Sequence, residues 1–81
     1  MQQLITTPSQ VGEIIRRRRK ARRISQRELA VKLGVSQGRF STIEGDPAGL
    51  TLDRLLALAN LLGLELVLQD KSDATVPSTE W

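Results

Sequence analysis

The sequence predicts a mostly α-helical domain of four to five helices with one β-strand after the last of them. Residues that cap helices recur ahead of stretches whose apolar residues have helical spacing, at Thr7, Ser25, Ser36 and Thr51. Gly34 and Gly63 follow two of these stretches, where glycine commonly ends a helix. Residues 64–70 instead alternate between apolar and polar side chains, which is typical of a half-buried strand.

The first helix is expected to begin at Thr7-Pro8. A capping threonine, a proline at the first helical position and Gln10 three residues after the cap together favour a helix start. The basic run over residues 16–23 has two interpretations, a disordered arm or an ordered helix with a basic side. We favour the helix, because a set of residues lies near one helical face: Val11, Ile14, Ile15, Arg18 and Ala21.

Two short helices joined by a tight turn are expected next. Ser25 and Glu28 form a second capping box, and Gly34 ends that helix after about Leu33. Ser36 caps a third helix over about residues 37–44. The apolar residues that would hold the pair together are Leu29, Ala30, Leu33, Val35, Phe40 and Ile43. Such a pair is a helix-turn-helix, whose second helix fits the major groove of B-DNA.

The last helix is expected between Thr51 and Gly63, after a loop over residues 45–49. Its inner face would carry Leu52, Leu55, Leu56, Ala59 and Leu62. The strand over residues 64–70 has no convincing partner strand in the chain, so it either pairs with another chain or is helical after all. We predict pairing between two copies about a two-fold axis, through Leu64, Leu66, Val67 and Leu68.

The composition favours a small binding protein that gains stability from a partner. A chain of 81 residues forms one domain, whose core alone rarely supplies more than about 3–5 kcal/mol. Cysteine, histidine and tyrosine are absent, so we expect no disulfide, metal, cofactor or catalytic site, and no small-molecule ligand is evident. We expect no signal peptide or membrane span and hence a cytoplasmic, nucleoid-associated protein. The expected divisions are a flexible N-terminus (1–7), a DNA-binding domain (8–63), a dimerisation strand (64–70) and a disordered tail (71–81).

Charge is distributed unevenly along the chain. Residues 14–39 hold ten Lys or Arg against the single Glu28, whereas residues 40–81 hold two basic residues against seven acids. The first half therefore suits a polyanion such as DNA, and the second half does not.

The residues Ser25-Gln26, Leu29-Ala30, Leu33-Gly34-Val35-Ser36-Gln37 and Ile43-Glu44 resemble the Cro/C1-type (XRE) repressor family over about residues 9–63. The resemblance implies a lambda-repressor-like fold that binds double-stranded DNA. It also implies that Gln26 meets a phosphate, that Gln37 reads a base, and that Arg19 and Glu44 form a structural ion pair. Chemistry supports both roles. The start of a helix favours a phosphate near Gln26, and the amide of Gln37 can bond adenine N6 and N7. The alternative is that neither glutamine has a partner.

Other residues of the motif are candidates for the same interface. Arg39 could span guanine O6 and N7 or hold a phosphate, and Gly38 would let the backbone come close. The expected base contacts are Gln37, Gly38, Arg39 and Ser41. The expected phosphate contacts are Gln26, Ser25, Ser36, Thr42 and Arg27. Which basic residues of the first helix touch phosphate stays open.

The strand and the tail ending in Glu80-Trp81 extend the resemblance to HipB-type antitoxins. Members of that family repress their own operon and bind a HipA-type Ser/Thr kinase toxin. Trp81 could anchor the tail in an apolar pocket of the toxin, or it could be a chance terminal residue. We predict a dimeric antitoxin that reads a palindromic operator; the alternatives are a stand-alone repressor and a protein-binding inhibitor that has lost its DNA.

Overall fold

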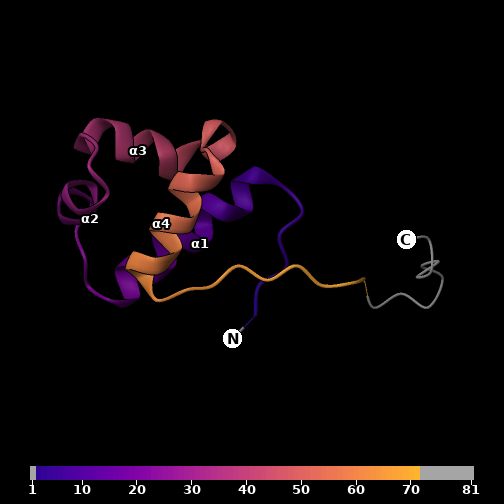
Figure 1. Cartoon of the computed structure of the whole chain (residues 1–81). Coiled ribbons are helices and arrows are strands. Elements are labelled where there is room, and N and C mark those ends of the chain that lie inside the picture. The colour runs from indigo at the N-terminus through magenta and orange to yellow at the C-terminus, as the bar shows by residue number, and fades with distance from the viewer. Residues whose placement is uncertain (1, 72–81) are drawn as a thin grey trace.

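Four α-helices and one short 3₁₀-helix make up the part of the chain that the computed structural model describes, residues 2–71 (Figure 1). Their bounds are α1 Pro8–Ala21, α2 Gln26–Leu33, α3 Gln37–Gly45, η1 Pro47–Gly49 and α4 Leu52–Leu62. In Figure 1, α4 lies in front of α1. The helices α2 and α3 occupy one end of the molecule, and the segment after α4 runs away from the helices. The predicted set of four helices is confirmed.

Short-range hydrogen bonds set the ends of the helices at the predicted places. The side-chain oxygens of Ser25, Ser36 and Thr51 each accept a backbone N–H three residues ahead, at 3.0, 3.0 and 3.2 Å. Gly34 and Gly63 end α2 and α4 in the left-handed conformation, with φ of 83° and 71°. Because glycine has no Cβ, it adopts this conformation without the steric cost that other residues meet.

The core lies where α1, α2, α3 and α4 meet. Its fully buried large side chains are Phe40, Leu29, Leu58 and Leu62. Ala30 and Ile43 are also buried, whereas Leu33 and Val35 are half-buried and pack at the edge of the core. The predicted packing between α2 and α3 is therefore confirmed.

The predicted inner face of α4 is partly wrong. Leu52 and Leu56 are 64% and 44% exposed, whereas Leu58, which the spacing does not place on that face, is fully buried. Leucines lie on several sides of this helix, so its apolar spacing alone does not choose a face. Packing against α1 and α2 makes that choice, and it leaves Leu52 and Leu56 in solvent.

The segment expected as a loop over residues 45–49 is more ordered than predicted. Gly45 completes α3, and Pro47–Gly49 forms the 3₁₀-helix η1, whose Pro47 is buried against α1 and α3. Glycine and proline indicated only that the α-helix ends here. The burial of Pro47 depends on contacts with residues distant in the sequence.

The predicted strand over residues 64–70 is absent from the single chain. Among residues 2–71 the structure contains no strand, and residues 64–71 have no regular secondary structure. A β-strand needs a second strand to bond its backbone groups, and residues 2–71 of one copy do not provide it. Within the same described range, no helix is long and apolar enough to cross a membrane.

Candidate nucleic-acid interface

The exposed side of α3 is polar along its length. All five residues predicted there are exposed: Gln37, Gly38, Arg39, Ser41 and Thr42. The opposite side carries Phe40, Ile43 and Glu44, which are buried. Burial of that side holds α3 on the core, so its amide, guanidinium and hydroxyl groups face outward as a group. These are donor and acceptor types that bond base edges and phosphates.

Several of the hydroxyls predicted to bind phosphate also form hydrogen bonds to the backbone of α2 or α3. Ser25 Oγ accepts the Glu28 N–H, and Ser36 Oγ accepts the Arg39 N–H. Thr42 Oγ1 donates to the Gly38 carbonyl at 3.2 Å. The two serine hydroxyls keep their own hydrogen as a donor, which a phosphate oxygen can accept. Thr42 has already used its hydrogen inside α3.

Arg19 and Glu44 form a buried ion pair. Arg19 Nε donates to Glu44 Oε2 at 2.6 Å, and Arg19 Nη2 donates to Oε1 at 3.3 Å. Arg19 Nη1 also donates to the Ile24 carbonyl at 3.0 Å. One guanidinium therefore joins α1, the turn before α2 and the end of α3.

Gln26 is half-buried, and its amide is bonded within the chain. Its Nε2 donates to Glu44 Oε1 at 2.9 Å. Arg16 approaches the same oxygen, with 3.9 Å between Nε and Oε1. The sequence predicted a phosphate contact for Gln26 but not this bond to Glu44, which joins residues 18 positions apart. Spacing within one helix carries no signal for such a contact.

The other basic residues near the motif divide between structural and exposed positions. Arg18 is half-buried, and its Nε donates to the Leu62 carbonyl at 3.0 Å, where it caps the end of α4. Its Nη2 lies 3.4 Å from the Gly63 carbonyl oxygen. Arg27, a predicted phosphate contact, is exposed near the start of α2. The other exposed basic residues of this region are Arg16, Arg17, Lys20, Arg22, Arg23, Lys32 and Arg39.

The predicted dimerisation residues lie at the margin of the domain. Leu64 is half-buried against the core, whereas Leu66, Val67 and Leu68 are 45%, 68% and 102% exposed. Trp81, the predicted toxin anchor, lies outside the described residues. Within residues 2–71, no group of three or more His, Cys, Asp or Glu side chains is placed to hold a metal ion.

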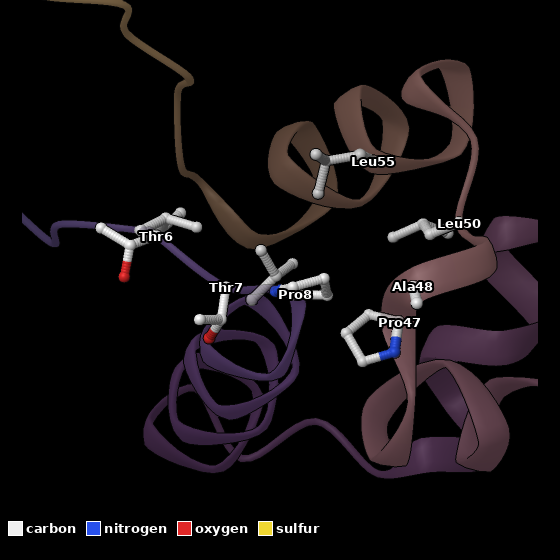
Figure 2. Close-up of a pocket in the computed structure, with 9 residues that line it drawn as sticks. Thr6, Thr7, Pro8, Pro47, Ala48, Leu50 and Leu55 are labelled. Atoms are coloured by element: carbon white, nitrogen blue, oxygen red, sulfur yellow. The ribbon is translucent and has the colours of Figure 1, made fainter.

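An open apolar groove of about 340 Å³ lies apart from this interface (Figure 2). In Figure 2, Thr7 and Pro8 line one side of the groove, Pro47 and Ala48 line another, and Leu55 lies above them. The lining comes from the N-terminal segment, the start of α1, η1 with Leu50, and α4. None of it comes from α2 or α3, so the groove is separate from the polar side of α3.

The pair α2 and α3, with a left-handed glycine between them and a polar outer side on α3, defines a helix-turn-helix protein. The protein-family comparison agrees, because the family described as "Helix-turn-helix domain" matches residues 10–71. This chain belongs to the helix-turn-helix domain family. Within it, the chain is similar to the antitoxin HipB of Escherichia coli (strain K12), with 32% identity over 78 residues that cover 96% of this chain and 89% of HipB.

Solved structures of HipB have the same fold. One described as a HipB-O1-O2 complex matches with a TM-score of 0.76 and 30% identity, covering 85% of this chain and all of that one. A HipA-HipB-O2-O3 complex matches with a TM-score of 0.76 and 30% identity over 85% of this chain and 97% of the other. A complex of a HipB variant with an O2 20mer matches with a TM-score of 0.77 and 30% identity over 86% and 97%. The resemblance to HipB-type antitoxins inferred from the sequence is confirmed.

Proposed function

We propose that this chain is a dimeric antitoxin that binds a palindromic operator, represses its own toxin-antitoxin operon and neutralises a HipA-type kinase, without catalytic activity of its own. The observation that carries the proposal is the exposed polar side of α3 in a chain 32% identical to HipB. HipB structures include a complex described with HipA and the sites O2-O3. A protein that binds its operator acts at the chromosome, so we place it in the cytoplasm at the nucleoid.

DNA binding follows from the chemistry of α3 and its surroundings. Gln37 and Arg39 are the residues proposed to read bases, with Gly38 and Ser41 beside them, because amide and guanidinium groups can form bidentate bonds to purine edges. The nine Lys or Arg of residues 14–39 other than the buried Arg19 supply the attraction to phosphate. Three of the exposed side chains proposed to meet the backbone, those of Ser25, Ser36 and Arg27, lie at the starts of α2 and α3.

The variant Gln37→Ala/Arg39→Ala tests this part of the proposal. We expect it to bind a duplex from upstream of its own gene at least tenfold more weakly, because each bidentate base contact contributes about 1–3 kcal/mol. Fluorescence anisotropy with the labelled duplex measures the affinity. The matched control is Gln3→Ala/Arg54→Ala, which removes the same two residue types at positions outside α2, α3 and the basic stretch 14–39. Unchanged affinity in the α3 variant would support a protein-binding inhibitor that has lost its DNA.

Dimerisation is proposed to occur on the outer side of α4 and the segment after it. Five large apolar residues are exposed there: Leu52, Leu56, Leu66, Val67 and Leu68. Leu56, Leu64 and Leu66 also line a shallow hollow between α4 and that segment. A second copy that pairs its residues 64–70 with these would bond the backbone groups and cover the leucines. It would also place two copies of α3 for the two halves of a palindrome.

Toxin binding is tested by co-purification. We expect a kinase-like gene beside the gene for this chain, and we expect its product to be retained when tagged antitoxin is purified from cells that express both. A stand-alone repressor would bind the operator and retain no such partner. Retention should survive Gln37→Ala/Arg39→Ala, because that variant changes only the side of α3 proposed to face DNA. Failure of the kinase to co-purify with the unmodified chain would favour the stand-alone repressor.

A further inference from the structure

A single carboxylate oxygen lies between side chains of α1 and α2. Glu44 Oε1 accepts a hydrogen bond from Gln26 Nε2 at 2.9 Å, and Arg16 Nε lies 3.9 Å from the same oxygen. The other oxygen, Oε2, is bonded by Arg19 at 2.6 Å. Gln26 and Arg16 are therefore neighbours in space although they are on different helices.

Two of these side chains, Arg16 and Gln26, are partly open to solvent. The Glu44 side chain is 1% exposed, whereas that of Arg16 is 50% exposed and Gln26 is half-buried. Arg19 already compensates the charge of Glu44, so the charge of Arg16 is in excess. A glutamine amide carries two N–H donors and a guanidinium carries five. One contact with Glu44 leaves the second amide N–H of Gln26 and the outer N–H groups of Arg16 for another acceptor.

We propose that Arg16 and Gln26 together bind one phosphate of the DNA backbone, held side by side by Glu44. The inference rests on the proposed DNA-binding function, because it places this phosphate beside the start of α2. A phosphate oxygen is an acceptor with negative charge, and it forms its strongest hydrogen bonds with a cationic donor such as a guanidinium. At this site the charged guanidinium of Arg16 and the neutral amide of Gln26 would both donate to the same phosphate.

The other arginines of the same helix turn are less suited to this role. Arg18 donates to the carbonyls that end α4, and Arg19 is buried with Glu44. Arg17 is exposed and, within residues 2–71, forms no ion pair. Arg19 also reaches Glu44 Oε1, at 3.3 Å, but it is buried, so Arg16 is the exposed arginine of this run that shares this oxygen with Gln26. The structure thus selects one residue from a run in which the sequence left the phosphate contacts open.

The test compares Arg16→Gln with Arg17→Gln, which removes the same charge one residue further along α1. The probes are a random-sequence duplex and the duplex from upstream of the gene, each titrated at several salt concentrations by fluorescence anisotropy. The slope of log affinity against log salt is negative, and loss of one phosphate contact decreases its steepness by about 0.9. We expect this decrease for Arg16→Gln, with binding about tenfold weaker, as for the loss of a charged hydrogen bond. We expect a smaller change for Arg17→Gln.

The variant Gln26→Ala separates one shared site from two independent ones. If both side chains hold the same phosphate, Arg16→Gln/Gln26→Ala loses less affinity than the product of the two single losses. Equal slopes for Arg16→Gln and Arg17→Gln would overturn the proposal, as would strictly multiplicative losses. Wild-type binding by both single variants would also overturn it, while the loss of operator binding in Gln37→Ala/Arg39→Ala would still support DNA binding by α3. Unchanged binding in that α3 variant would instead refute the proposed function.

Discussion

Arg19 of α1 and Glu44 of α3 form an ion pair in which Nε and Oε2 are 2.6 Å apart and the two side chains are 10% and 1% exposed. A buried carboxylate without a partner is costly, because it has lost its water and gained no compensating charge. The pair therefore holds the end of α3 against α1. Through Gln26, the same carboxylate also contacts α2.

Glu44→Ala should destabilise the protein by about 3–5 kcal/mol, because it leaves the Arg19 guanidinium buried and without its carboxylate. Urea unfolding followed by circular dichroism measures this change. The control is Glu13→Ala, which removes an exposed carboxylate and should have an effect within about 0.5 kcal/mol. Arg19→Met/Glu44→Leu should lose less stability than Glu44→Ala, because no unpaired charge remains. Equal losses for Glu44→Ala and Glu13→Ala would contradict this account of the pair.

Gly12→Ala should also destabilise the fold, through a steric clash with α3. A Cβ at position 12 would clash with the backbone carbonyl oxygen of Glu44, so α1 and α3 would have to move apart. We expect a loss of about 1–3 kcal/mol, as for overpacking in a core. Gly38→Ala is the matched control, because a Cβ there meets nothing within 4 Å. Thermal unfolding of both variants checks the prediction, which fails if Gly12→Ala is as stable as Gly38→Ala.

Arg23→Gly should stabilise the protein by about 1 kcal/mol. Arg23 has a φ of 58°, in the left-handed region that costs a residue with a Cβ about 1–2 kcal/mol. Glycine removes that cost at the end of α1, although it also raises the entropy of the unfolded chain. Arg17→Gly removes the same charge inside α1 and should destabilise by about 1 kcal/mol. Urea midpoints that fall in both variants would show that the backbone at position 23 is not strained.

Leu66→Pro should weaken the dimer, because proline removes a backbone N–H from the segment proposed to pair between copies. Light scattering over a range of protein concentrations measures the mass. The control is a chain that ends after residue 70, which keeps the whole segment and should remain dimeric. A Leu66→Pro protein with the full dimer mass at micromolar concentration would exclude residues 64–70 as the main contact.

Removal of residues 71–81 should weaken binding to the kinase and leave operator binding unchanged. The tail contains Trp81, a large aromatic side chain of the kind that often dominates binding energy. Trp81→Ala in the full chain should reproduce much of the loss. Isothermal titration with the purified kinase, together with anisotropy on the upstream duplex, distinguishes the two activities. Unchanged affinity of the shortened chain for the kinase would reject the tail as an anchor.

The local features of the fold were predictable from the sequence, because their causes lie within a few residues. Ser25, Ser36 and Thr51 cap helices through bonds to N–H groups three residues ahead, and such bonds do not depend on the rest of the chain. The buried side of α3 also followed from spacing, since only Phe40 and Ile43 are large and apolar there. Once that buried side is known, the polar residues left on the exposed side of α3 are the candidate interface.

The arrangement of the helices decided what spacing left ambiguous. In α4, leucines on several sides offered more than one core face, and contact with α1 and α2 buried Leu58 rather than Leu52 or Leu56. The contacts of the individual arginines depend on where the other helices lie. Arg19 pairs with a carboxylate of α3, Arg18 bonds the end of α4, and Arg16 lies beside Gln26 of α2. Because caps and turns are short-range, the order of residues alone sets where the helices begin and end. Which of several identical side chains are buried, paired or exposed depends on partners distant in the chain, and only the folded arrangement supplies those partners.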